Sequence, residues 1–170
     1  MHKRKVILYI AVSLDGFIAG NNDDLSWLPP NDDYGYEKFL TSVDTVLLGR
    51  RTYDIAKAFD PWPYKKQTSI VFSRTTRENE ENIIFTKEKP VNALKEILQK
   101  PGKDIWLCGG AQLYAELNDF IDEFIISIIP IILGEGIRLF SDKSMKMNLI
   151  LKDHKVFDDG LVQLHYTRKR

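Results

Sequence analysis

The sequence predicts a three-layer α/β/α fold with a central mixed, mostly parallel β-sheet and a C-terminal antiparallel hairpin. Short apolar runs rich in branched residues alternate with segments of helical periodicity, the pattern of parallel strands covered on both faces by helices. Two alternating segments near the C-terminal end flank Asp158-Asp159-Gly160, a typical hairpin turn. No repeat or linker interrupts the chain, so we expect one domain spanning residues 1–170.

The expected elements follow one another in a regular order. Strands are predicted at 6–12, 44–48, 68–72, 82–85, 104–108 and 121–133, with hairpin strands at 149–157 and 161–167. Helices are predicted at 34–41, 52–58 and 91–99, and after Gly109-Gly110 through Leu117. In an open sheet of this kind, ligands collect at the carboxyl ends of the strands.

Composition excludes several classes of function. The formal net charge is zero, from 24 basic and 24 acidic residues, whereas nucleic-acid-binding proteins carry a basic excess. A single cysteine, Cys108, allows no intramolecular disulfide and no cysteine-rich zinc site, so no metal is expected. No apolar run approaches the ~18 residues needed to span a membrane. We therefore expect a cytoplasmic protein with neither nucleic-acid nor membrane partners.

A long polar stretch from Ser13 to about Asp33 follows the first predicted strand. Connections longer than about 15 residues are uncommon unless they are functional or disordered. This stretch also contains apolar residues, which indicate that it packs over other parts of the molecule: Phe17, Ile18, Leu25, Trp27 and Leu28. We interpret it as an active-site loop.

The second predicted strand ends in a glycine followed by two arginines and a threonine. Gly49 permits a close turn, Arg50 and Arg51 offer guanidinium groups suited to phosphate, and Thr52 adds a hydroxyl donor. A solvated arginine pair beside an ordinary turn explains the same residues equally well. Taken alone, this motif does not decide between the two.

Two further strand ends carry similar features. Gly109 and Gly110 precede Ala111-Gln112 at a predicted helix start, where they permit either close approach of a pyrophosphate or simply a tight turn. Ser73 and Arg74 follow another strand, and they either hold a 2′-phosphate or begin an ordinary polar loop. The three ends should share one rim of the sheet, which favours a long anionic ligand such as NADPH.

In their order and spacing, four segments resemble the dihydrofolate reductase superfamily. The likeness is closest to the stand-alone relatives of the reductase domain of bacterial riboflavin biosynthesis, the RibD C-terminal domain. It covers nearly the whole chain. The segments that carry it are Ala11-Val-Ser-Leu-Asp-Gly-Phe-Ile-Ala19, Leu48-Gly-Arg-Arg-Thr52, Gly109-Gly-Ala-Gln-Leu-Tyr114 and Asp122-Glu-Phe-Ile with Pro130-Ile-Ile-Leu-Gly-Glu-Gly136.

The resemblance implies an NADPH-dependent reductase, of the 5-amino-6-(5-phosphoribosylamino)uracil reductase type or a divergent relative, acting on a small heterocycle. It also implies a homodimer. The phosphates of NADPH would lie on the three strand ends described above. The nicotinamide pocket would be lined, largely through backbone groups, by Ala11, Ile18 and Ala19.

Candidate catalytic and substrate-binding residues follow from the same resemblance. Folate reductases place a carboxylate shortly after a tryptophan, and the matching candidates are Asp32 and Asp33, which helix capping explains as well. Asp15 either faces the substrate or makes an Asp-Gly turn. Three side chains are candidates for contact with the substrate, although the aromatic ones are equally expected in a core: Trp27, Tyr34 and Glu135.

Two alternatives stay open at this point. Folate reductases bind the folate tail with an arginine, whereas the corresponding region here offers only Lys65 and Lys66, which disfavours folate reduction proper. The second alternative is a protein that binds NADPH without catalysis, because the phosphate-binding residues alone do not distinguish an enzyme from a sensor.

Overall fold

The computed structural model describes residues 3–30, 33–75, 77–140 and 146–169. Eight strands form the main sheet in the order β5-β4-β3-β6-β1-β7-β10-β9, and a small second sheet pairs β2 with β8. The strands are β1 (Val6–Ser13), β2 (Phe17–Ala19), β3 (Val43–Gly49), β4 (Thr68–Phe72), β5 (Ile83–Thr86), β6 (Asp104–Gly109), β7 (Glu123–Ile129), β8 (Ile137–Arg138), β9 (Leu149–Val156) and β10 (Val162–Arg168). The helices are α1 (Tyr36–Ser42), α2 (Arg50–Ala56), α3 (Pro90–Leu98) and α4 (Ala111–Leu117), with 3-10 turns at Asn21–Asp23 and Asn118–Phe120.

The sheet is parallel from β5 through β7, and β10 alone runs in the opposite direction to its neighbours β7 and β9. At its centre, Leu8 of β1 pairs with Leu107 of β6 on one side and Phe124 of β7 on the other. These three side chains are fully buried, as expected for strands covered on both faces. The predicted mostly parallel sheet with a C-terminal hairpin is confirmed.

Two apolar clusters hold the layers together, one on each face of the sheet. Leu8 packs in the cluster that contains Leu94 of α3 and Leu117 of α4. Its neighbour Ile7 points the other way, into the cluster that contains Tyr53 of α2. Alternation along β1 therefore supplies both cores, because successive side chains of a strand point to opposite faces.

The structure differs from the predicted elements at several boundaries. Helix α2 begins at Arg50 rather than Thr52, directly after the extended residue Gly49. Strand β7 ends at Ile129, well before Leu133, because Pro130 follows it and cannot donate a ladder hydrogen bond. The short strands β2 and β8 were not predicted, since two or three residues give no readable alternation.

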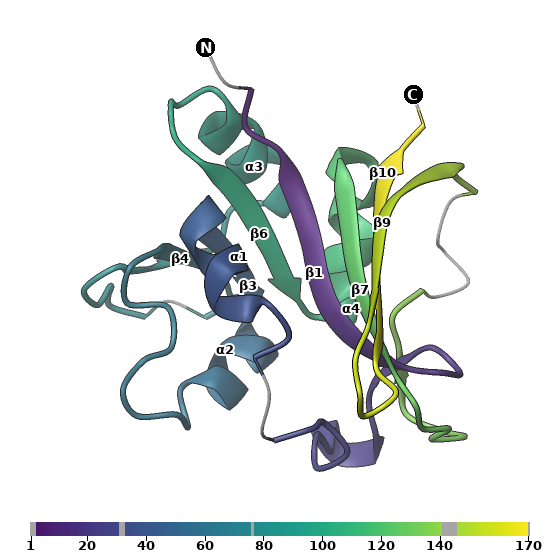
Figure 1. Cartoon of the computed structure of the whole chain (residues 1–170). Coiled ribbons are helices and arrows are strands. Elements are labelled where there is room, and N and C mark those ends of the chain that lie inside the picture. Colours follow the sequence, from purple (N-terminus) through teal and green to yellow (C-terminus); the bar gives the residue numbers. More distant parts are fainter. Residues whose placement is uncertain (1–2, 31–32, 76, 141–145, 170) are drawn as a thin grey trace.

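The carboxyl ends of the parallel strands and the chain ends lie on opposite sides of the molecule. Figure 1 shows both termini at the top and the long loop that follows β1 at the bottom, beside the ends of β1 and β7. Within the described residues, no helix has the length and apolar character required to cross a membrane.

Candidate functional site

A cleft of about 1400 Å³ lies along the carboxyl ends of the strands. Its walls come from the ends of β3, β4 and β6, from β1 and β7 in the floor, and from the loop after β1. Every residue predicted to hold the cofactor lines this one cleft: Ala11, Ile18, Ala19, Gly49, Arg50, Arg51, Thr52, Ser73, Arg74, Gly109, Gly110, Ala111 and Gln112. The fold therefore brings together the strand ends that the sequence suggested individually.

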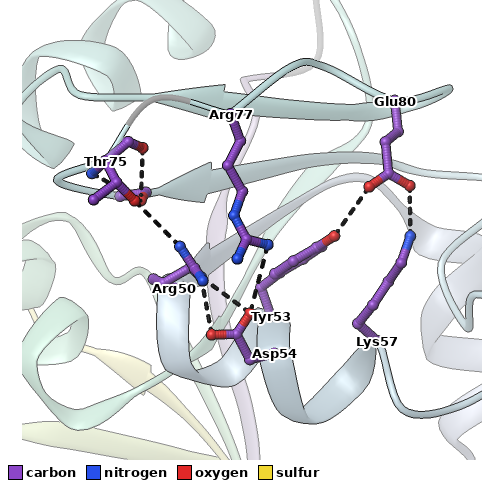
Figure 2. A network of polar contacts seen from close by, with 8 residues as sticks. Arg50, Tyr53, Asp54, Lys57, Thr75, Arg77 and Glu80 are labelled. Carbon is purple, nitrogen blue, oxygen red and sulfur yellow. Dashed lines mark hydrogen bonds and ion pairs between the residues drawn. The ribbon is translucent and has the colours of Figure 1, made fainter.

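Arg50 is the most constrained cation at one end of the cleft. Its Nε donates to both carboxylate oxygens of Asp54, at 2.9 and 3.0 Å, and its terminal nitrogen donates to Thr75 Oγ1 at 3.3 Å. Ser73 Oγ donates to the Thr75 carbonyl at 2.9 Å, so the β4 end is folded back toward Arg50. Figure 2 shows Arg50 between Asp54 and Thr75, with Arg77 on the same side of Asp54.

Arg51 has a different neighbour. Its Nε donates to the carboxylate of Asp23 at 2.5 Å, which connects α2 to the loop after β1. The Arg51 side chain is 69% exposed, whereas that of Asp23 is 23% exposed. Arg51 therefore lines the cleft and also binds the loop after β1 through Asp23. The sequence pattern alone does not show this second contact.

The glycines at the ends of β3 and β6 lie against each other. A Cβ atom on Gly49 would approach the backbone nitrogen of Gly110 to 3.4 Å, and one on Gly110 would approach Thr52 Oγ1 to 3.3 Å. At Gly109, where φ is +143°, a Cβ would come within 2.8 Å of the Tyr114 hydroxyl. Both the left-handed backbone and the close packing require glycine at position 109. The glycines therefore let the ends of β3 and β6 pack closely together while all three line the cleft.

Residues of β1 and β2 supply an apolar part of the cleft lining. Ala11 and Ile18 face the cleft together with Ala19, which is nearly buried. Their side chains are small or aliphatic, so a flat ring can approach the backbone there. Both alanines are at the positions that the resemblance assigns to the nicotinamide ring.

Aromatic side chains form another part of the cleft wall. Tyr9 of β1 stacks on Phe39 at 4.2 Å between ring centroids, and the ring of Trp106 is edge-on to both. Tyr36 and Tyr64 line the same region, and Tyr64 lies 5.2 Å from Trp106. Burial raises the pKa of the Tyr36 and Tyr64 phenols, so both are neutral near pH 7. This end of the cleft suits a flat ring.

A small hydrogen-bond network lies beside these aromatic rings. Gln163 Nε2 donates to Ser127 Oγ at 3.1 Å, to Tyr9 Oη at 3.4 Å and to the Tyr34 carbonyl at 3.4 Å. Gln163 and Ser127 are buried at 8% and 6% exposure, yet Ser127 and Tyr9 still line the cleft. Burial also raises the pKa of Tyr9, which keeps its hydroxyl protonated. These groups can hydrogen-bond to polar atoms at the edge of a ring.

The three candidate carboxylates have separate positions. Asp33 lines the cleft but accepts hydrogen bonds from the backbone amides of Gly35 and Glu37, at 3.0 and 2.8 Å, so it caps α1. Asp32 lies outside the described residues. Asp15 is not among the cleft residues, and its carboxylate accepts from the amides of residues 133 and 134. Within the described part of the chain, Asp33 is therefore the candidate carboxylate that reaches the cleft.

The three residues predicted to contact the substrate also differ in whether they line the cleft. Tyr34 lines the cleft, where its hydroxyl bonds to Asp159 and its ring packs edge-on against Phe157 at 5.0 Å. Trp27 and Glu135 are not among the lining residues: the Trp27 indole donates to the Asp24 carbonyl at 3.0 Å, and Glu135 is exposed. The structure therefore brings Tyr34, but neither of the other two, to the cleft.

Several cleft residues were missed by sequence reasoning. Tyr9 and Ser127 sit within apolar strands, and a polar group in such a run is itself a signal, because buried polar groups need partners. Asp54 and Trp106 gave no comparable signal, since an acid in a short helix and an aromatic in a strand are common. Among the described residues, no group of three or more His, Cys, Asp or Glu could hold a metal ion.

Known proteins resemble this chain along nearly its whole length. The family model of the RibD C-terminal domain matches residues 4–163. The uncharacterized protein YwjB of Bacillus subtilis is 42% identical over 173 residues, 98% of this chain and 99% of the relative. A structure from Shewanella sp. PV-4, provisionally named a riboflavin biosynthesis protein, has a TM-score of 0.86 at 31% identity, covering 98% of this chain and 99% of that one.

Dihydrofolate reductase from Enterococcus faecalis, solved with NADP(H) and RAB-propyl, has the same architecture. The TM-score is 0.74 over 99% of this chain and 98% of that one, and the identity of 18% restricts the comparison to the fold. The chain therefore belongs to the RibD C-terminal domain family, and its fold is that of dihydrofolate reductase-like proteins.

Proposed function

We propose that this protein is an NADPH-dependent reductase that transfers hydride to a small, flat heterocycle, such as a ribosylaminopyrimidine or a pteridine. The observation that carries the proposal is the single cleft. Its lining combines hydrogen-bond donors and cations, aromatic rings, and small apolar residues. Membership of a reductase family supports the same oxidoreductase class.

The residues present fit the proposed cofactor. Arg50 and Thr52 offer a guanidinium and a hydroxyl, and Gly110 leaves the backbone open, as a phosphate-binding surface requires. Arg74 is exposed on the same rim, and no ion pair holds it within the described part of the chain. Arg50, Ser73 and Arg74 are the residues we assign to a 2′-phosphate.

When bound, NADPH supplies the hydride, and the protein supplies position and protons. Ala11, Ile18 and Ala19 would admit the nicotinamide ring, while Tyr9 and Ser127 would hydrogen-bond the edge of the substrate ring. The walls of this region are apolar, so a bound ring would exclude water. The neutral phenol of Tyr9 is placed to hold a proton there, and the carboxylate of Asp33 lines the same cleft.

A titration with NADPH and NADH tests the cofactor assignment. We expect NADPH to bind more tightly than NADH, and Arg50→Met to weaken NADPH binding about tenfold while leaving NADH nearly unchanged. Lys152→Met on the exposed strand β9 is the control and should change neither. If neither nucleotide binds the wild-type protein, the reductase proposal is wrong.

Measurement of substrate turnover distinguishes the proposed reductase from a folate reductase and from a non-catalytic NADPH-binding protein. Substrate-dependent NADPH oxidation with ribosylaminopyrimidines or pteridines, but not dihydrofolate, supports the proposed substrate class. Turnover of dihydrofolate alone would indicate folate reduction proper. Binding of NADPH without turnover across the panel would indicate a non-catalytic NADPH-binding protein.

We propose in addition that two copies associate and that the protein works in the cytoplasm, where NADPH and such heterocycles are found. Strand β7 lies between β1 and β10 and therefore offers no free sheet edge. Strand β9 instead forms an edge of the sheet with exposed apolar side chains at Ile150, Leu151 and Val156. Such an edge favours pairing with another chain. Sedimentation of the wild type and of Leu151→Lys measures this association, which we expect the lysine to weaken.

A further inference from the structure

The cation-rich end of the cleft contains one carboxylate that contacts two arginines. Asp54 Oδ2 lies 2.9 Å from Arg50 Nε, and Asp54 Oδ1 lies 3.8 Å from Arg77. Arg77 is held in place by the rings of Tyr53 and Phe85, with its guanidinium carbon 5.9 and 5.8 Å from their centroids. Figure 2 shows both guanidinium groups on one side of the Asp54 carboxylate, each joined to it by an ion pair.

Figure 2 also contains a second carboxylate, Glu80, which differs from Asp54 in its access to the cleft. Asp54 lines the cleft and its side chain is 48% exposed. Glu80 bonds to Lys57 at 2.5 Å and to the Tyr53 hydroxyl at 3.2 Å, and is not a lining residue. A bound anion at the β4 end would therefore meet the charge of Asp54 first.

The position of Asp54 opposes the charge of a ribose 2′-phosphate in two ways. Its two oxygens occupy the Nε donor of Arg50, and its negative charge repels a phosphate placed beside the same arginine. A carboxylate near the ribose 2′-hydroxyl is the feature that favours NAD, whereas arginine favours NADP. Here both types of side chain lie at one place.

We propose that Asp54 sets the nucleotide selectivity of the cleft, by occupying Arg50 and so weakening the preference for the 2′-phosphorylated nucleotide. The inference rests on the proposed function, because it assumes that a dinucleotide lies along this rim. It assigns Asp54 as a specificity-determining residue, and it implies that the natural protein accepts NADH to a measurable degree.

The test compares the wild-type protein with Asp54→Asn, which retains the size of the side chain and removes its charge. We expect the ratio of the NADH to the NADPH dissociation constant to rise about fivefold, a moderate change because the pair is exposed to solvent. The ratio of the 5′-ADP to the 2′,5′-ADP dissociation constant should rise in the same way, although these probes carry no nicotinamide. The effect of Asp54→Asn on both ratios should diminish as ionic strength rises. Glu80→Gln is the matched control and should leave both ratios unchanged.

The outcomes distinguish this inference from the proposed function. An increased ratio in Asp54→Asn, absent in Glu80→Gln, supports the role of Asp54. An unchanged ratio overturns it, while the cofactor assignment stands if the wild type binds NADPH. A decreased ratio also overturns it, since Asp54 would then be orienting Arg50 toward the phosphate. Absence of any dinucleotide binding by the wild type overturns the proposed function and this inference together.

Discussion

The carboxylate of Asp15 accepts a 2.8 Å hydrogen bond from the backbone amide of Gly134, a residue 119 positions later in the chain. It also accepts from the amide of Leu133 at 3.1 Å and from the hydroxyl of Ser13 at 2.7 Å. Through these bonds, the turn between β1 and β2 is joined to the loop between β7 and β8. Asp15 therefore holds these two segments together.

Asp15→Asn should lower the melting temperature, because the amide replaces one acceptor with a donor that faces backbone N–H groups. The Ser13 hydroxyl and then the two amides lower the pKa of Asp15 from 3.8 to about 2. Since the folded state has the lower pKa, the stabilisation is complete above about pH 4 and is lost as the pH falls toward 2. Thermal unfolding across this range should show the two proteins converging at acid pH. A constant difference would contradict the assignment.

Tyr9→Phe should reduce substrate turnover with little change in the affinity for NADPH. The substitution removes a hydroxyl that lines the cleft and accepts from Gln163, while the aromatic stacking on Phe39 is kept. We expect kcat/KM to fall about five- to tenfold, the effect of one hydrogen bond. Tyr53→Phe removes a hydroxyl that faces Glu80 and serves as the control. Equal losses in both variants would place Tyr9 outside the substrate site.

Gly109→Ala should destabilise the protein by about 3 kcal/mol or more, through backbone strain and a steric clash together. The new Cβ would lie 2.8 Å from the Tyr114 hydroxyl, which is fixed by its 2.5 Å bond to the Cys108 carbonyl. Gly134→Ala isolates the strain, since Gly134 also has positive φ (+78°) but no atom within 4 Å of the added Cβ. Urea denaturation of the two variants should therefore give clearly different losses, and equal losses would exclude the clash.

Cys108 should react slowly with iodoacetamide in the folded protein, although it lines the cleft. Burial raises the pKa of its thiol to about 12, so almost no thiolate is present near pH 8. Because the chain has a single cysteine, the mass of the intact protein reports labelling at this position. Labelling should become rapid in denaturant. Rapid labelling of the folded protein at pH 8 would contradict this environment of the thiol.

The sequence predicts well the order of elements and the meeting of three strand ends along one cleft, since both depend on short local signals. Glycines and arginines after apolar strands are visible as patterns, and parallel strands must bring their carboxyl ends to one edge. The hydrogen-bond network beside the aromatic rings was not predicted. Tyr9, Ser127 and Gln163 come from three strands far apart in the sequence, and only their pairing in the sheet joins them. The bonds from Leu133 and Gly134 to the carboxylate of Asp15 were not predicted for the same reason, because these two residues are more than a hundred positions away.

The bond between Arg51 and Asp23 couples occupancy of the cleft to the position of the loop after β1. One member belongs to the loop after β1, and the other belongs to the rim assigned to phosphates. An anion that binds Arg51 in place of Asp23 releases the loop, and movement of the loop makes Arg51 available to an anion. The coupling free energy is the same in both directions. Solvent limits that energy to roughly 1 kcal/mol for so exposed a pair. Loop position and nucleotide occupancy are thus thermodynamically linked, and salt concentration acts on both.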